Sequence, residues 1–283
     1  MIATGIAAIV ILIAAQTLAL LVGNLPVMIG FPVAAGNVVA GIAYPVLAFA
    51  GIKIWVSGCL KQDMQRYKMA RAKPRMIWCC AAIIMPCMVY AIVLCFVAGQ
   101  WEVTPMRSSE IWETVTGGIF FYGIGAGLVE EMIFRGLIMS ALEYRWNQYV
   151  AIAIPSILFA VLHIAGNPLS FTSFVQLLIA GSIVGILFSL VTYESGNVWN
   201  SAIMHGIWNM MVIGGILHIG GAADTQSIYS YVLNTKSFLI TGGDFGIEAS
   251  IVSILAYVVF ILLAIVLIGR QKKRADKTCA ARG

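Results

Sequence analysis

Residues 115–142 read VTGGIFFYGIGAGLVEEMIFRGLIMSAL, and this stretch decides the fold. It is apolar along most of its length, which predicts one long helix in lipid, yet Glu130, Glu131 and Arg135 lie near its middle. On insertion scales each charged side chain costs roughly 2.5–3.5 kcal/mol at the centre of a membrane helix. A cluster of three such residues therefore indicates a functional site or a strong structural need.

Helical spacing separates the three charged residues into two groups. Glu131 and Arg135 are four residues apart, so they share a helix face and can neutralise each other. Glu130 points about 100° away from Glu131. We therefore predict that Glu131 and Arg135 support the site while Glu130 is free to act. The alternative is that Glu130 is only a structural ion-pair partner of Arg135.

The composition predicts a polytopic membrane protein. The chain has 283 residues, of which 61% are hydrophobic and 10% charged, and its mean hydropathy is +0.95. We expect an all-α bundle of about eight transmembrane helices, each close to the roughly 20 apolar residues that a bilayer requires. The expected spans are about 2–22, 34–56, 77–98, 115–142, 149–165, 171–192, 198–219 and 249–269.

The distribution of charge predicts the orientation of these spans. Lys and Arg are concentrated in residues 57–76 and in the tail after Gly269, whereas 99–114 and 220–248 carry acidic residues instead. The positive-inside rule places the two basic segments and both termini in the cytoplasm, and the two acidic loops outside. We expect the plasma membrane of a bacterium or archaeon. No basic patch with interleaved aromatic residues suggests nucleic acid as a partner.

Four polar residues in the apolar helices are expected to meet. Glu130 lies 17 residues before the turn at Asn147, and His163 lies 16 after it, so in a helical hairpin both reach the same depth. His205 and Asn209 are four residues apart, so they share one face of a later helix. We predict that the four side chains line one cavity open to the cytoplasm.

Such a cavity is suited to hydrolysis. A carboxylate in an apolar site can act as general base, and a neighbouring imidazole can hold a water molecule against it. An imidazole and an amide on one helix face are suitable donors for the oxyanion of a tetrahedral intermediate. No Ser or Cys is placed beside a His as a nucleophile would be, which favours direct attack by water.

Three short motifs resemble a known family. EEMIFR (130–135) matches EExxxR, FAVLH (159–163) matches FxxxH, and HGIWN (205–209) matches HxxxN. In this order, on successive apolar helices, they resemble the CAAX prenyl protease type 2 and bacteriocin-processing family, also called the CPBP or ABI family, of intramembrane endopeptidases. The resemblance covers roughly residues 115–215. Each motif alone is a weak signal, and the three together are a specific one.

The resemblance implies roles for the matched residues. Glu130 would activate water, His163 would help to bind that water, and His205 with Asn209 would form the oxyanion hole. Glu131, Arg135 and Phe159 would support the site, Phe159 by packing. The resemblance also implies a catalytic core at 115–219, preceded by helices and a basic loop at 1–114. An extracytoplasmic loop, the last helix and the basic tail would follow at 220–283.

The sequence leaves the cofactor and the partner partly open. Two His and one Glu could bind zinc, but no HExxH pair is present and the resemblance favours a site without metal or other cofactor. The expected partners are membrane lipids and a membrane-associated peptide or lipidated protein. Two alternatives remain. One is a non-proteolytic scaffold or bacteriocin-immunity protein of the same fold, and the other is a proton-coupled carrier with Glu130, Arg135 and His163 as its relay.

Overall fold

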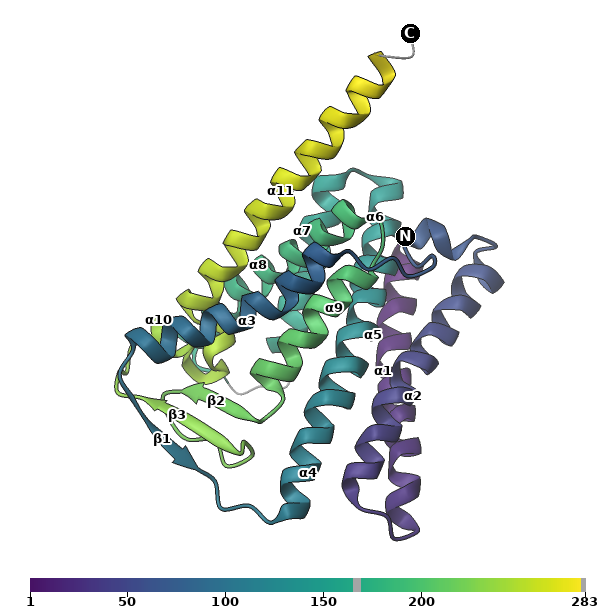
Figure 1. Cartoon of the computed structure of the whole chain (residues 1–283). Helices are drawn as coiled ribbons and strands as arrows, with labels where there is room; N and C mark the ends of the chain where they lie inside the picture. The colour runs from purple at the N-terminus through teal and green to yellow at the C-terminus, as the bar shows by residue number, and fades with distance from the viewer. Residues whose placement is uncertain (165–168, 281–283) are drawn as a thin grey trace.

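The computed structural model describes residues 1–164 and 169–280, and in this part of the chain most residues are helical (Figure 1). Six helices there are long and apolar enough to cross a membrane. Five of them are α1 (Ile2–Met28), α2 (Val33–Lys53) with the π-helical segment η1 (Ile54–Cys59), α3 (Met76–Phe96), α8 (Phe171–Ser195) and α11 (Ile251–Ala280). The predicted class, a helical multi-pass membrane protein, is confirmed.

The sixth long helix runs without interruption from Ser108 to Arg145. It consists of α4 (Ser108–Thr116), η3 (Gly117–Ala126), α5 (Gly127–Glu131), η4 (Met132–Ile138) and α6 (Met139–Arg145), of which η3 and η4 are π-helical. The predicted helix at 115–142 is therefore correct and is longer than expected. The two π-helical segments flank the residues Glu130 and Glu131.

The first two helices show why these sequences pack as they do in lipid. The buried positions of α1 are small, among them Ala8, Ala15 and Ala19, whereas Ile6 and Val10 point outward. Small residues allow helix backbones to approach closely where no hydrophobic effect drives association. The α1 and α2 helices consequently pack side by side along most of their length (Figure 1).

Two of the predicted spans form helices too short to count as membrane-crossing by length, although α7 (Gln148–Ile164) has the length that was predicted for 149–165. α7 has 17 residues, and α9 (Trp199–Trp208) continues only through the π-helical segment η5 (Asn209–Ile213). The prediction of a span over 198–219 is wrong at its C-terminal end, where Gly214 and Gly215 follow. Gly215 has φ +76°, a left-handed conformation that ends helices.

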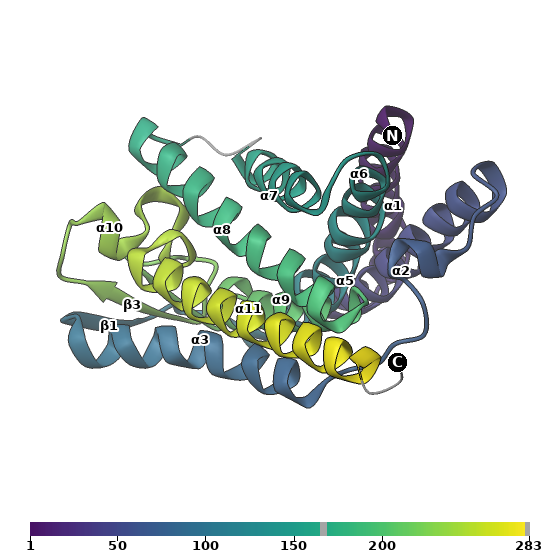
Figure 2. The ribbon, with the colours of Figure 1, turned by 90° about the horizontal axis from the view of Figure 1, so that it is seen from above.

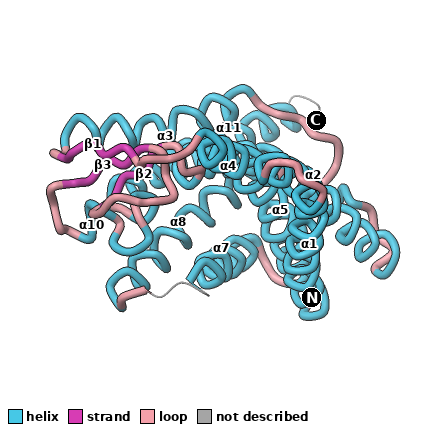
Figure 3. The backbone as a smooth tube through the Cα atoms, turned by 90° about the horizontal axis from the view of Figure 1, so that it is seen from below, coloured by secondary structure: helices cyan, strands magenta, loops and turns pink. Residues whose placement is uncertain are grey.

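A small sheet forms from two predicted loops and from residues at the end of the span predicted over 198–219. β1 (Gly99–Val103) pairs antiparallel with β3 (Tyr229–Leu233), and β2 (Leu217–Gly220) pairs parallel with the other edge of β3. Figure 3 shows the strands together at one edge of the bundle. The short helices α10 (Phe238–Thr241), η6 (Gly243–Phe245) and η7 (Ile247–Ala249) follow the sheet, and η2 (Met64–Tyr67) lies in the basic loop. The segment 220–248 is therefore largely structured.

The later helices surround a common centre. α8 packs against α7, α9 and α11, while α9 also packs against α5 and α3 (Figures 1 and 2). The helices that carry the three motifs thus meet around one region of the bundle. The N-terminal pair of helices lies beside it (Figure 2).

A buried carboxylate joins three helices at one end of the bundle. Glu194, near the end of α8, accepts hydrogen bonds from Arg75, from the indole of Trp78 on α3 (2.7 Å) and from Gln271 on α11 (2.7 Å). Arg75 belongs to the basic loop and Gln271 to the basic tail, so these segments lie at the same end of the molecule. The positive-inside orientation requires this arrangement.

Candidate functional site

The helix that carries the carboxylates touches the helix of His205 through glycines. A Cβ atom at Gly127 would lie 2.6 Å from Cα and 2.7 Å from the backbone nitrogen of Gly206. Only glycine permits an approach of this kind, because any side chain would overlap the opposing backbone. α5 and α9 therefore lie backbone against backbone, one helical turn from Glu130 and Glu131.

Glu131 is the centre of a buried network. Its Oε1 atom accepts hydrogen bonds from Arg135 Nη1 (2.9 Å) and from His205 Nδ1 (3.0 Å). Arg135 also donates to the carbonyl oxygen of Gly185 on α8 (3.0 Å). The side chains of Glu131 and Arg135 are both fully buried. The i, i+4 pair thus extends to a third residue, His205, which the sequence analysis did not connect to it.

Aromatic rings enclose the guanidinium group of Arg135. Its Cζ atom lies 4.8 Å from the ring centre of Phe159 and 5.4 Å from that of Phe188. The ring of Phe159 also contacts His163, with 4.4 Å between the ring centres. Phe159 therefore packs between the buried ion pair and the imidazole of His163.

Glu130 faces the two imidazoles and not Arg135. Its Oε2 atom lies 3.7 Å from His205 Nε2 and 3.9 Å from His163 Nε2, and it makes no hydrogen bond with any described residue. About a fifth of the side chain (19%) is exposed, whereas that of Glu131 is completely enclosed. One carboxylate is hydrogen-bonded to the scaffold, and the other lies against two ring nitrogens.

Hydrogen bonds on the far side of each ring fix the orientation of both imidazoles. His163 Nδ1 lies 2.8 Å from the carbonyl oxygen of Phe159, and His205 Nδ1 lies 3.0 Å from Glu131. A carbonyl oxygen and a carboxylate only accept hydrogen bonds. The hydrogen-bond network therefore assigns a proton to the Nδ1 atom of each imidazole. The Nε2 atoms of both rings consequently face Glu130.

Asn209 contributes an amide at the end of the same helix. Its Nδ2 donates to the carbonyl oxygen of Tyr122 (3.1 Å), which lies in the π-helical segment η3, and its Oδ1 has no partner among the described residues. An amide nitrogen carries two protons, so one N–H remains for a ligand. Asn209 is therefore anchored and still able to donate.

His163, His205 and Asn209 line a cavity of about 40 Å³ among α7, α8, α9 and α11, whereas Glu130, which the sequence analysis placed on the same cavity, is not among its lining residues. A water molecule requires roughly 10–15 Å³ by such a measure, so about two or three waters fit. The polar residues of the lining are His163, His205, Trp208, Asn209, Glu248 and Tyr257. The sequence analysis predicted the two histidines and Asn209, but it did not predict the other three.

Glu248 is the main surprise of this lining. Its position in an acidic loop indicated a solvent-exposed residue, but η7 carries it to the cavity wall. No local sequence pattern predicts that Glu248 reaches the cavity, because this depends on how the segment before α11 folds back onto α8 and α9. Trp208 lies within the HGIWN motif and directly precedes Asn209, and this position was the one feature of the sequence that could have placed Trp208 near the site.

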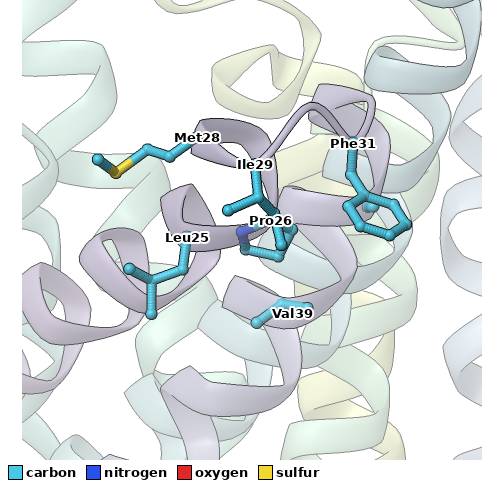
Figure 4. A pocket seen from close by; sticks show the side chains of 7 residues that line it. Leu25, Pro26, Met28, Ile29, Phe31 and Val39 are labelled. Carbon is cyan, nitrogen blue, oxygen red and sulfur yellow. The ribbon is translucent and has the colours of Figure 1, made fainter.

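A larger hollow of about 560 Å³ lies at the turn between α1 and α2 (Figure 4). Its walls are apolar side chains such as Leu25, Met28 and Phe31. It offers no titratable side chain and lies on the lipid-facing pair of helices, so it is not a candidate for chemistry.

The distances around Glu130 can be compared with those of a zinc site. Two ligands of a tetrahedral zinc, at roughly 2.0–2.1 Å from the metal, lie about 3.4 Å apart. Here the carboxylate oxygen and the two imidazole nitrogens are separated by 3.7 and 3.9 Å. Among residues 1–164 and 169–280, no group of three or more His, Cys, Asp or Glu side chains forms a metal site.

The helices of this membrane protein bring together a carboxylate, two imidazoles and an amide, which are groups suited to hydrolysis. Residues 112–211 match the family model of the Rce1-like type II CAAX prenyl endopeptidases. The matched segment contains all three motifs. The match indicates protease activity within the membrane. Neither the curated proteins nor the solved structures give a match.

Proposed function

We propose that the protein hydrolyses a peptide bond of a membrane-associated peptide or lipidated protein, with Glu130 as general base. The observation that carries the proposal is the placement of Glu130 Oε2 between the Nε2 atoms of His163 and His205, at 3.9 and 3.7 Å. The Rce1-like family match supports the reaction class and favours a prenylated protein ending in a CAAX sequence as the substrate.

The nucleophile is a water molecule held by Glu130 and His163. Atoms that are 3.9 Å apart can both lie at a hydrogen-bonding distance of about 2.8 Å from one water oxygen. Glu130 accepts one proton of the water, and the unprotonated Nε2 of a neutral His163 accepts the other. The lone pairs of the water oxygen are then free to attack the carbonyl carbon, while Glu130 takes the proton.

The oxyanion that forms is held by His205 and Asn209. The Nδ1–H group of His205 donates a hydrogen bond to Glu131, so His205 can also donate from Nε2 only as an imidazolium. With Glu130 and Glu131 ionised, Arg135 and the imidazolium bring the cluster to zero net charge. A neutral cluster is the least costly in an apolar surrounding. Glu131 thus stabilises the charged form of the oxyanion donor, and the second N–H of Asn209 completes the pair.

The proposed reaction requires no metal ion. The proposal rests on the donor distances around Glu130, which are too wide for tetrahedral zinc, and on the water that a carboxylate and an imidazole can activate by themselves. Turnover that survives a strong chelator, added during purification and assay, is the expected result.

The test compares cleavage by purified protein in lipid vesicles. A quenched peptide with a prenylated CAAX end, the same peptide without the prenyl chain, and a leader peptide are incubated with wild type, Glu130→Ala and Glu113→Ala. Glu113 is an exposed carboxylate of the same long helix and serves as the matched control. We expect cleavage by wild type and Glu113→Ala only. Equal cleavage by Glu130→Ala would rule out the proposed base.

The scaffold alternative makes the opposite prediction in cells. If the protein acts only by binding, Glu130→Ala complements a deletion as well as wild type does. If it acts by hydrolysis, complementation fails although the variant is present in the membrane at wild-type amounts.

A further inference from the structure

Glu248 is a second carboxyl group near the candidate site, close enough to Glu130 for the two to interact electrostatically. It lies in η7, just before the last membrane-spanning helix, and outside the family match at 112–211. Its side chain lines the same small cavity as His163, His205 and Asn209. The proposed reaction described above leaves it without a role.

Two aromatic residues hold Glu248 in place. The indole N–H of Trp208 donates a hydrogen bond to its carboxyl group, and the hydroxyl of Tyr257 donates to its backbone oxygen (3.0 Å). The two rings pack edge to face, with 5.2 Å between their centres. Trp208 directly precedes Asn209, so the carboxyl group of Glu248 is hydrogen-bonded to the helical segment that carries the proposed oxyanion donors, His205 and Asn209.

The surroundings of Glu248 favour its protonated form. Its side chain is partly buried, and its pKa is raised to about 8, mainly because burial disfavours the charged form. The hydrogen bond from Trp208 opposes this shift, and the negative charge of Glu130 contributes to it. At neutral pH Glu248 is therefore an acid with a proton to give.

The other titratable and polar groups near Glu248 do not accept its proton. The carboxylate of Asp244 on η6 accepts hydrogen bonds from the backbone N–H of Ser170 and from Ser173, which lower its pKa. α8 contributes the neutral amide of Gln176 next to η7, where it donates to Ala249. The other groups that face the cavity or the carboxyl group are Tyr257 on α11, His163 on α7, His205 on α9 and Glu130 on α5.

We propose that Glu248 is a catalytic acid that protonates the departing amine nitrogen. When the tetrahedral intermediate collapses, the C–N bond breaks, its electron pair goes to nitrogen, and the proton of Glu248 forms the N–H bond of the new amine. Glu248 is left as a carboxylate and Glu130 holds the proton taken from water. Transfer of that proton through cavity water to Glu248 restores both groups for the next turnover.

This division of labour gives the two carboxyl groups, Glu130 and Glu248, separate tasks. An amide nitrogen cannot depart as an anion, so it needs an acid. His205 and Asn209 bind the oxyanion, and the Nδ1–H group of His163 donates a hydrogen bond to a backbone carbonyl oxygen. Carboxyl groups whose environments push their protonation apart can serve as base and acid in one site. The inference rests on the proposed hydrolysis.

The experiment compares two leaving groups. One substrate is the cleaved peptide, and the other is its thiodepsipeptide, in which sulfur replaces the scissile nitrogen. A thiol has an ordinary pKa of about 8.5, so it departs as a thiolate without an acid. The variants are Glu248→Gln and, as an exposed acidic control on the same side of the protein, Glu102→Gln. Rates are corrected for spontaneous hydrolysis.

We expect Glu248→Gln to cleave the peptide about 100-fold more slowly or worse, and the thiodepsipeptide within about threefold of wild type. Wild-type cleavage of the peptide falls as the pH rises through about 8, where Glu248 loses its proton, and this decline is absent with the thiodepsipeptide. Glu102→Gln behaves as wild type on both substrates.

Other outcomes overturn the inference. An equal loss on both substrates means that Glu248 is structural, and no loss on either means that another group protonates nitrogen. Failure of the proposed function looks different, because wild type would then cleave neither substrate.

Discussion

The substitution Gly127→Ala is expected to push apart the two helices that form the site. The added methyl carbon would lie 2.6 and 2.7 Å from backbone atoms of Gly206, whereas ordinary contacts begin at 3.4 Å. Neither backbone can turn away as a side chain can. α5 and α9 must therefore separate by about 0.8 Å, which is also the scale at which misplacement impairs catalysis.

The size of the expected loss in kcat follows from the contacts that this separation of the helices breaks. The hydrogen bond from His205 Nδ1 to Glu131 would lengthen from 3.0 Å to about 3.8 Å, beyond the usual limit. A misplacement of about 1 Å costs roughly 100-fold in rate, and overpacking costs about 1–3 kcal/mol of stability. We expect kcat to fall by about two orders of magnitude while the protein still folds.

The assay measures kcat, KM and the thermal unfolding midpoint in lipid vesicles or detergent. Gly5→Ala is the matched control, because a Cβ atom at Gly5 meets nothing within 4 Å and should change none of these quantities. A Gly127→Ala protein with at least half of the wild-type kcat would refute the reasoning that the glycine contact sets the site geometry.

Two further substitutions test the networks around the site. In Glu131→Gln the amide oxygen still accepts hydrogen bonds from Arg135 and His205, but its neutral side chain no longer favours the imidazolium form of His205. We therefore expect kcat to fall about 10²–10³-fold at nearly constant KM. A loss of thermal stability without a loss of kcat would contradict this expectation. Glu194→Ala leaves the buried indole N–H of Trp78 unpaired and should lower the unfolding free energy by about 1–3 kcal/mol. Glu194→Gln keeps a hydrogen-bond acceptor and should lower it less. Equal losses in the two variants would show that the hydrogen bond is not the cause.

Local periodicity was sufficient to predict two of the contacts between motif residues. The i, i+4 spacing placed Glu131 beside Arg135, and the equal distances of Glu130 and His163 from Asn147 placed them at one depth. Both arguments use only the rise and turn of a helix. The class of the fold followed in the same way from long apolar runs.

Contacts between distant segments could not be read from local patterns. The hydrogen bond from His205 to Glu131 depends on the close approach of Gly127 and Gly206, which share no sequence pattern. Glu248 reaches the cavity through the path of an acidic segment that looked like an exposed loop. The sheet likewise joins strands that lie more than one hundred residues apart, such as β1 and β3.

The most direct test of the account is the single-turnover rate of Glu130→Gln on the cleaved peptide. Glutamine has the size of glutamate and keeps the cavity filled, but it cannot accept a proton from water. The account predicts a rate about 10²–10⁴ times lower than that of wild type, with an unchanged unfolding midpoint. A rate within threefold of wild type would contradict the claim that Glu130 activates the water.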